Sequence, residues 1–329
     1  MKRTEFGAES VGITGQQTHG ESVFPVVFRC SDPGADVKAV EELIAAHREA
    51  LIAEAEQNGA ILFRDFPLAT AEDFDAFVAA FGLPNFPYYE SLSNAVRVNR
   101  TPRVFTANEA PPTVTIYLHH EMAQTPIYPA KLFFFCEQPA ETGGATPVCR
   151  SDVLWERLKE RCPAFARGCE LKGLRYSHVM PNENDAASGM GRSWQSTLRT
   201  GTRAEAEERL RELGYEWEWL ADGLRVTTPV LPAVRKLADG RTTFFNQLIA
   251  AASGWKDSRN DPSRAITFGD GAPLDRDAVL VAVQLGEELS FDIPWQRGDV
   301  ALVDNFVAMH GRRTFTGTRK VLASLIAVS

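Results

Sequence analysis

Two histidines and a glutamate are the residues whose types and spacing best suit a metal ion. His119 and Glu121 lie two positions apart in the segment Tyr-Leu-His-His-Glu-Met at 117–122. In an extended strand alternate side chains share a face, so His119 and Glu121 point to one side and His120 to the other. The best candidate for a third ligand is His310, close to the C-terminus. Two histidines and one carboxylate form the facial triad that holds non-haem Fe(II) and leaves three coordination positions open.

A hydroxyl and a guanidinium are placed to serve the same site. Thr146 follows a Gly143-Gly144 turn, and Arg319 begins the last predicted strand. An arginine inside a barrel can bind a carboxylate through two parallel hydrogen bonds, and a threonine hydroxyl can contact the same anion. A metal triad with a buried arginine and threonine is what an enzyme needs to chelate a 2-oxo acid and to anchor its far carboxylate.

The elements that must position these residues are mostly strands. Short apolar runs predict strands around the candidate site at 60–64, 131–136, 300–303 and 321–328. A similar run at 279–285 also predicts a strand. Helical periodicity lies mainly on the N-terminal side, at 36–58 and 70–81. We therefore expect a mainly β protein with flanking helices (α+β), specifically a double-stranded β-helix, or jelly roll, with helices supporting one sheet.

The chain is expected to form one domain with two additions. Residues 1–22 have no hydrophobic period and predict a flexible N-terminal segment, and residues 23–329 form the jelly-roll domain. From about 164 to 260 the composition shifts toward Arg, Asn and Gly and includes four tryptophans. This stretch lies between the two halves of the presumed metal site. We therefore interpret it as an insertion, and we expect it to act as a lid over the open side of the barrel.

Composition excludes several classes of partner. The net charge of −8 argues against binding a nucleic-acid backbone or an anionic membrane, since either would need a basic face. No apolar run approaches the roughly 18 residues of a membrane span, and the first residues lack the apolar core of a secretion signal. The five cysteines are scattered and odd in number, which favours a reduced, cytoplasmic protein.

Several motifs, in order along the chain, resemble the TauD/TfdA family of Fe(II)- and 2-oxoglutarate-dependent oxygenases. The resemblance is closer to the branch of clavaminate-synthase-like enzymes and amino-acid hydroxylases of peptide natural-product pathways. It covers most of the chain, from about Gly59 to the C-terminus. The segments that carry it are 59–64, 118–122, 135–147, 243–247 and 304–319.

The resemblance implies a role for each residue of the site. The triad of two histidines and Glu121 would bind iron, with Glu where taurine dioxygenase itself has Asp. Thr146 and Arg319 would contact the 2-oxoglutarate carboxylate. Family members often carry arginines later along the last strand, where this chain has Lys320 and Ser324. Arg312 or Arg313 could therefore share the role of Arg319. The implied cofactors are Fe(II), 2-oxoglutarate as co-substrate, and O2.

Three further residues are candidates for contacting the substrate. Asn246 lies in a motif of this branch, and either lines the pocket or serves as a structural amide. His178 and Arg192 lie in the insertion, where each could meet a polar group of the substrate or belong to a solvated loop. His120, on the opposite face from the triad, is expected to be a packing or supporting residue.

The predicted activity is hydroxylation of an unactivated C–H bond, with release of succinate and CO2. The substrate is expected to be a small molecule, an amino acid or a derivative of one, either free or presented on a carrier protein. Desaturation, epoxidation or cyclisation with the same cofactors is an alternative outcome. A non-catalytic jelly-roll binding or sensor protein is the alternative of another class. Because Glu121 occupies the coordination position that related halogenases leave to chloride, oxygen chemistry is favoured over halogenation.

Overall fold

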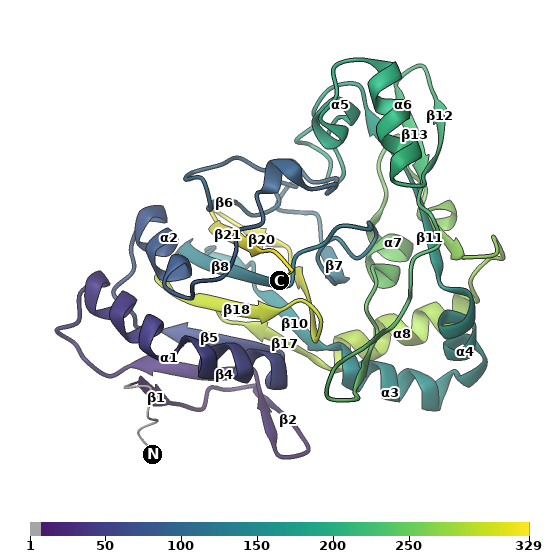
Figure 1. The fold of residues 1–329 in the computed structure, drawn as a ribbon. Coiled ribbons are helices and arrows are strands. Elements are labelled where there is room, and N and C mark those ends of the chain that lie inside the picture. The colour runs from purple at the N-terminus through teal and green to yellow at the C-terminus, as the bar shows by residue number, and fades with distance from the viewer. Residues whose placement is uncertain (1–7, 329) are drawn as a thin grey trace.

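The computed structural model describes residues 8–328, and its core is a pair of β-sheets (Figure 1). The larger sheet has seven strands, in the order β1 (Ala8–Ser10), β4 (Val26–Cys30), β5 (Ala60–Arg64), β18 (Val300–Asp304), β8 (Lys131–Gln138), β21 (Lys320–Ile326) and β6 (Phe105–Thr106). The smaller sheet has four, in the order β17 (Ser290–Ile293), β10 (Thr146–Arg150), β19 (Ala308–Arg312) and β7 (Ile116–His119). The protein is thus mainly β with flanking helices, as predicted.

The two sheets pack against each other through one apolar cluster. Leu132 and Phe134 of β8 meet Val148 of β10 and Ala308 of β19 in this cluster. Their neighbours Phe133 and Phe135 alternate to the other face of the larger sheet. This period of two explains why 131–136 is a continuous apolar run: β8 is buried on both faces. The cluster holds the two sheets close together, and the site residues lie at this junction.

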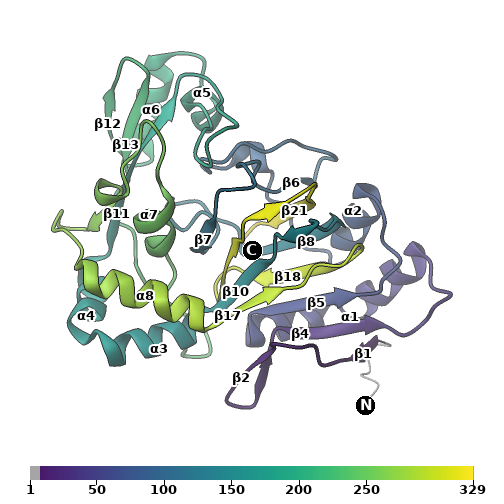
Figure 2. The ribbon, with the colours of Figure 1, turned by 180° about the vertical axis from the view of Figure 1, so that it is seen from behind.

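Two helices cover the outer face of the larger sheet (Figure 2). They are α1 (Val37–Asn58) and α2 (Ala71–Ala79), close to the predicted ranges. The side chain of Asp36 accepts from the Ala39 amide at the start of α1, and Thr70 and Asp73 form a reciprocal capping box on α2. The N-terminal helices therefore follow from local signals in the sequence.

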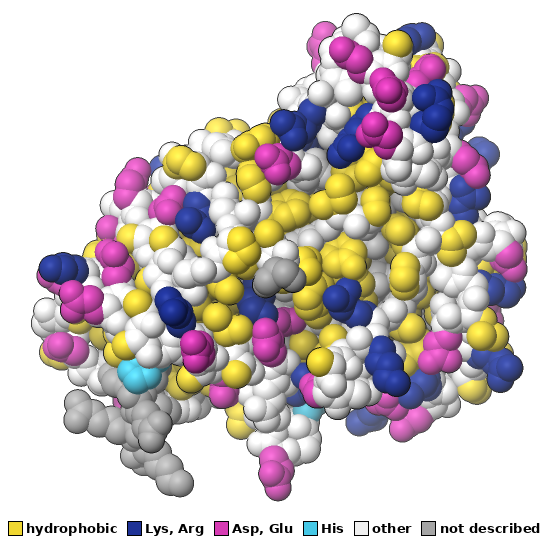
Figure 3. Space-filling model, viewed as in Figure 1, with side chains coloured by type: hydrophobic (Ala, Val, Ile, Leu, Met, Phe, Trp, Pro, Cys, Tyr) yellow, Lys and Arg dark blue, Asp and Glu magenta, His cyan; other side chains and the backbone are white. Residues whose placement is uncertain are grey.

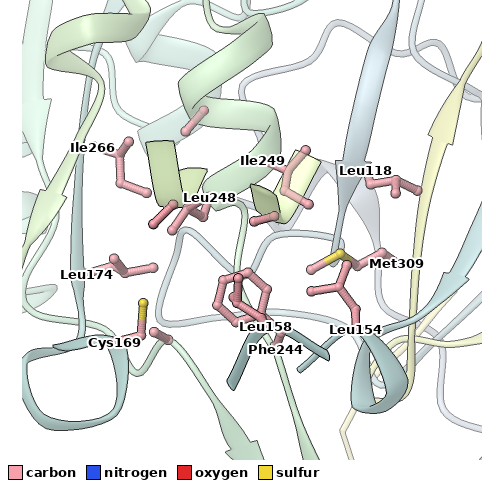
Figure 4. Close-up of a cluster of buried hydrophobic side chains, with 14 of the residues drawn as sticks. Leu118, Leu154, Leu158, Cys169, Leu174, Phe244, Leu248, Ile249, Ile266 and Met309 are labelled. Atoms are coloured by element: carbon pink, nitrogen blue, oxygen red, sulfur yellow. The ribbon is translucent and has the colours of Figure 1, made fainter. Parts of the chain in front are cut away.

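Three more helices cover the outer face of the smaller sheet. They are α3 (Ser151–Arg161), α7 (Leu248–Gly254) and α8 (Arg276–Glu288), and α4 (Pro163–Lys172) packs behind them on α3 and β16. Figure 4 shows part of the resulting cluster, in which Leu118 and Met309 from the sheet lie near Leu154 and Ile249 from the helices. These helices therefore support the strands β7 and β19 from behind.

The structure corrects one predicted strand. Residues 279–285 lie inside α8, not in a strand. The buried positions Ala278, Ala282, Leu285 and Gly286 recur at helical spacing, and Asp275 caps the first turn by accepting from the amide of Asp277. The β-branched valines of this run favoured a strand, but the burial of one helical face decides the outcome.

The insertion forms a lobe beside the two sheets (Figures 1 and 2). Its sheet has the order β12 (Glu216–Trp219), β13 (Gly223–Thr227), β11 (Leu174–Pro181) and β16 (Ile266–Phe268), with the helices α5 (Trp194–Leu198) and α6 (Arg203–Glu212) alongside. Because β16 pairs with β11, this unit extends a few residues beyond the predicted end near 260. The short elements elsewhere are β2 (Gln17–His19), β3 (Ser22–Phe24), η1 (Tyr88–Glu90), β9 (Thr142–Gly143), β14 (Arg235–Lys236), β15 (Thr242–Thr243), η2 (Pro262–Arg264) and β20 (Phe315–Thr316).

Part of the N-terminal segment differs from the expectation of a loose chain. Residues 1–7 lie outside the described residues, but β1 pairs with β4 at the edge of the larger sheet, and β2 pairs with β3 as a hairpin. The segment is too polar to show a period, yet backbone pairing holds it in place. Among residues 8–328, no helix is long and apolar enough to cross a membrane.

Candidate active site

The three predicted metal ligands come together where two strands of the smaller sheet meet. β19 pairs with β7 so that His310 lies opposite His119. Glu121 follows two residues after His119, just past the end of β7. Its Oε2 atom lies 3.8 Å from Nε2 of His119 and 3.4 Å from Nε2 of His310. One ligand atom from each residue falls within 4.8 Å of the other two. Residues far apart in the sequence therefore form one compact cluster.

The cluster fits a divalent ion by its donor set and by an unused acceptor. Glu121 Oε2 is buried and has no hydrogen-bond partner among the described residues, although it lies beside two imidazole nitrogens. The Nδ1 atom of His119 lies 2.8 Å from the carbonyl oxygen of Tyr117, which directs Nε2 toward the carboxylate. Two imidazole nitrogens and one carboxylate oxygen are the donors that non-haem Fe(II) prefers. A single ion would satisfy all three atoms.

Protonation states at the cluster also suit metal binding. Burial, and to a lesser extent the nearby His119, lowers the pKa of His310 to about 4. Burial alone would raise the pKa of Glu121, but the Arg97 guanidinium and the two imidazoles outweigh it and hold the pKa well below its usual range. At neutral pH His310 is therefore neutral and Glu121 is ionised, as metal ligands must be.

One asparagine joins the two halves of the site. The Oδ1 atom of Asn305 accepts from the backbone amide of Glu121 at 2.7 Å, and its Nδ2 donates to the Glu121 carbonyl at 3.0 Å. Asn305 is fully buried between β18 and β19. Asn305 thereby connects two segments: the turn that contains Glu121 and the loop that precedes His310. The polar pair 304–305 is noticeable in the sequence, but this contact is visible only in the fold.

The strand that carries His310 needs a glycine beside it. A Cβ atom on Gly311 would lie 2.5 Å from the carbonyl oxygen of Ile116 on β7. The pairing of β19 with β7 also shifts register between His310 and Arg312. A side chain at position 311 would push the two strands apart and separate His310 from His119. Gly311 therefore permits the close approach on which the cluster depends.

His120 points away from the cluster, as the strand alternation predicts. Its Nε2 atom lies 2.8 Å from the Ser151 hydroxyl, and its Nδ1 lies 2.5 Å from the Asn305 carbonyl. Burial lowers the pKa of His120 to about 3, so this imidazole is neutral. His120 supports the site from behind.

The two predicted anion-binding residues lie in a cavity that also reaches the cluster. Arg319, which directly precedes β21, donates from Nη2 to Thr146 Oγ1 at 3.3 Å and from Nε to the Gly144 carbonyl at 2.8 Å. Trp295 Nε1 donates to the same hydroxyl at 3.0 Å. The cavity is lined by residues of both sheets, including Phe134, Thr146, His310, Arg319 and Val321.

Arg319 is a cation without a counter-charge. No carboxylate in residues 8–328 forms an ion pair with it. Burial, and to a lesser extent the neighbouring charge of Arg312, lowers its pKa to about 10. A partly buried cation beside an open cavity can bind an anion such as a carboxylate.

The alternative arginines are engaged elsewhere. Arg312 lines the same cavity, but it donates to the carbonyl groups of Ala110, Pro111 and Val114 at 2.7–2.8 Å. It therefore fixes the loop in front of β7. Arg313 forms ion pairs with Glu287 and Asp292 at the surface. The geometry thus favours Arg319 over both as the anion-binding residue.

A second cavity adjoins the first and opens between the sheets and the insertion. The two cavities share Arg97, Asn108, Ile116, His119 and Glu121. One wall comes from residues 93–97 and 108–117, and the other comes from the insertion through Gly189, Met190, Gln247, Ala250, Gly254 and Trp255. In the space-filling view, hydrophobic side chains gather in a hollow between the lobe of α5 and α6 and the rest of the molecule (Figure 3).

The three predicted substrate contacts do not line this second cavity. Asn246 donates to the Ala233 carbonyl at 2.8 Å and accepts from the Leu248 amide, so it is a structural amide at the start of α7. Arg192 donates to the backbone carbonyls of Ser91 and Ser93 and supports the cavity wall from outside. His178 is buried 5.7 Å from the ring of Trp255, one layer behind the cavity. Hydrogen bonds hold Asn246 and Arg192 in these places, and His178 packs against Trp255.

Four residues of the site had no signal, or only a weak one, in the sequence. Arg97, Asn94 and Gln124 line the second cavity, and Trp295 contacts Thr146. Arg97 and Asn94 lie in an irregular stretch without periodicity. Only Gln124, three positions after Glu121, was close enough to the metal motif to be suspected.

Comparisons with known proteins agree with this geometry. Residues 22–325 match the family model described as taurine catabolism dioxygenase TauD, TfdA family. A clavaminate synthase-like protein of Arabidopsis thaliana is 41% identical over 318 residues, which cover 94% of this chain and 96% of that protein. The dapdiamide synthesis protein DdaC of Enterobacter agglomerans is 28% identical over 288 residues, 82% of each chain.

The fold is similar to that of a solved oxygenase. PvcB, described as an Fe, α-ketoglutarate-dependent oxygenase from an isonitrile synthetic pathway, superposes with a TM-score of 0.53 at 15% identity, covering 92% of this chain and 86% of that one. The family match and the Arabidopsis relative confirm the resemblance that the sequence motifs indicated. The chain belongs to the TauD/TfdA family and is an Fe(II)- and 2-oxoglutarate-dependent dioxygenase.

Proposed function

We propose that this dioxygenase hydroxylates an unactivated C–H bond of an amino acid or an amino-acid derivative, in a site built between the two walls of a double-stranded β-helix. The observation that carries the proposal is the cluster of His119, Glu121 and His310 near Arg319, a cation that has no carboxylate partner among residues 8–328. A binding module would have no need of both. The non-catalytic alternative is therefore disfavoured.

The protein residues divide the work around the iron. His119, Glu121 and His310 would hold Fe(II), which supplies the oxidising power for C–H cleavage when it binds O2 and 2-oxoglutarate together. Arg319 and Thr146 bind the far carboxylate of 2-oxoglutarate and orient its 2-oxo acid end toward the cluster. Trp295 holds the threonine hydroxyl in place.

The second cavity is the proposed place of the substrate. It shares His119 and Glu121 with the first cavity, so a molecule bound there lies beside the metal cluster. Its polar groups include the Gln124 side-chain oxygen, which is buried without a partner in the described structure. The ammonium or amide of an amino acid would supply the missing donor. The relation to a dapdiamide synthesis protein supports an amino-acid-derived substrate.

The insertion is proposed to cover this cavity as a lid. Met190 and Trp255 come from the insertion and face Ile116 and Tyr117 of β7 across the cavity. Closing this side would exclude water from a reactive iron site. Limited proteolysis of residues 164–260 should slow when iron, 2-oxoglutarate and substrate are present together. Equal cleavage rates with and without substrate would contradict the lid.

The function is tested by coupling substrate oxidation to succinate release. Purified protein with Fe(II) and 2-oxoglutarate should release succinate in proportion to a product that gains one oxygen, on a panel of amino acids and their carrier-bound thioesters. His310→Ala should abolish turnover, whereas His47→Ala on the outer helix α1 should leave it unchanged. A product that loses two hydrogens would identify desaturation or cyclisation instead. No succinate on any substrate would refute the proposal.

A further inference from the structure

Arg97 brings a second charged group to the metal cluster. It lies in the irregular chain between η1 and β6, and its Nη2 atom donates to Glu121 Oε1 at 3.0 Å. The two side chains are only 7% and 4% exposed. A buried ion pair of this kind is costly to form, and the loss of one partner strongly destabilises the protein. Arg97 lines both cavities and contacts a presumed metal ligand, so a role beyond stability is open to it.

The contact makes the two oxygens of Glu121 different. Oε1 is engaged by Arg97, whereas Oε2 points toward the Nε2 atoms of His119 and His310 and has no partner among the described residues. A carboxylate can bind a metal through one oxygen or through both. If both oxygens bound, one of the positions needed by 2-oxoglutarate or O2 would be filled.

Arg97 is itself held in place by aromatic rings. Its guanidinium carbon lies 4.7 Å from the ring centre of Tyr88 and 5.4 Å from that of Phe105. The Tyr88 hydroxyl in turn donates to the Ala95 carbonyl at 2.5 Å. Cation–π contacts in a buried site restrict the guanidinium to one orientation. The donor that faces Glu121 is therefore fixed before any metal binds.

We propose that Arg97 is a positioning residue that keeps Glu121 monodentate, so that three coordination positions stay open. This inference rests on the proposed function, because it takes His119, Glu121 and His310 as the ligands. Arg97 holds Oε1, leaves Oε2 to the ion, and prevents the carboxylate from turning to offer both oxygens. Partners that orient a ligand in this way typically change metal affinity by about 10–100-fold when they are removed.

A matched pair of variants separates positioning from folding. Arg97→Gln removes the charge beside Glu121. Arg64→Gln removes the charge from another buried pair, Arg64 with Asp299, whose atoms lie 2.7 Å apart and whose side chains are 10% and 1% exposed. Both variants are expected to lower the unfolding temperature of the metal-free protein. Affinity for Mn(II), measured by titration of the full chain, is the deciding readout.

The expected results differ sharply between the two. Arg97→Gln should change Mn(II) affinity by about 10–100-fold, and Arg64→Gln should leave it unchanged. At saturating Mn(II), Arg97→Gln should also weaken 2-oxoglutarate binding, because the freed Oε1 fills a position. Arg97→Lys should restore part of both affinities, since an ammonium can still donate to Oε1, and it serves as the test if Arg97→Gln does not fold.

Three outcomes would overturn the inference. In the first, Arg97→Gln (or Arg97→Lys, where only that variant folds) binds Mn(II) with the affinity of the wild type. In the second, Arg64→Gln changes that affinity as much as Arg97→Gln does. In the third, 2-oxoglutarate affinity is unchanged in a metal-saturated Arg97→Gln protein, which would refute the monodentate role. If the wild-type protein itself fails to bind Mn(II), the proposed function fails as well, so the two failures are distinguishable.

Discussion

Arg319→Met should abolish tight 2-oxoglutarate binding without destabilising the protein that lacks 2-oxoglutarate. In that state Arg319 is a partly buried cation whose pKa is lowered to about 10, mainly by burial and then by the charge of Arg312. This lowering corresponds to about 3 kcal/mol of unfavourable charging. The cost is present at all pH values below 10, so the protein carries it in full at neutral pH.

Arg319→Met removes this charging cost, but two smaller losses of stability oppose the gain. The variant loses the hydrogen bonds to the Gly144 carbonyl and to Thr146, which are worth about 0.5–1.5 kcal/mol each. The free energy of unfolding without 2-oxoglutarate should therefore stay equal or rise slightly. Binding of the 2-oxoglutarate carboxylate, by contrast, loses its charged partner, at a cost of about 2–5 kcal/mol. That cost weakens affinity by roughly 30-fold to several thousand-fold.

The assay compares urea denaturation with and without 2-oxoglutarate in the metal-loaded protein. Wild type should be stabilised by 2-oxoglutarate, and Arg319→Met should not. Arg313→Met, which removes a surface ion pair with Glu287 and Asp292, should respond as the wild type does. The reasoning is refuted if Arg319→Met retains wild-type affinity, or if it is several kcal/mol less stable without 2-oxoglutarate.

Four further predictions follow from the same contacts. His310→Ala should lose Mn(II) and Fe(II) binding by titration while keeping the circular dichroism spectrum of the wild type, because Gly311 and the flanking strand residues still pair. Thr146→Val should raise the KM for 2-oxoglutarate about 10-fold with little change in kcat, since it removes one neutral contact to the carboxylate; a larger defect than that of Arg319→Met would contradict the assignment. Turnover in high chloride should yield no chlorinated product by mass spectrometry, because Glu121 already fills the position that chloride would need. The metal-free protein should lose stability as pH falls from 6.5 toward 4, by about 1.4 kcal/mol per pH unit for each buried neutral histidine. Burial lowers the pKa of His120 to about 3 and of His178 to about 4, so the unfolded chain takes up protons first. His178→Phe should make the dependence of the unfolding free energy on pH, measured by urea denaturation, shallower, and an unchanged slope would contradict the prediction.

Local chemistry in the sequence determined much of the fold. The alternation of side chains in a strand placed His119 and Glu121 on one face and His120 on the other, and the structure has this arrangement. Apolar runs identified β5, β8, β18 and β21, and polar caps identified α1 and α2. These signals depend on neighbours a few residues away, so they can be read without knowing the fold. The family motifs add which distant histidine completes the triad.

Only the tertiary structure decided how each polar side chain is used. Arg312 and Arg319 are equally cationic in the sequence, but several backbone carbonyls of the 110–114 loop engage Arg312, whereas Arg319 contacts only the Gly144 carbonyl and the Thr146 hydroxyl among the described residues. Asn246 faces Ala233 and Leu248, not the cavity, and Arg97 reaches Glu121 from an irregular segment that shows no pattern. A donor's function depends on which acceptors surround it, and those acceptors come from segments far away along the chain. Packing, not residue type, therefore selected the members of the site beyond its metal motif.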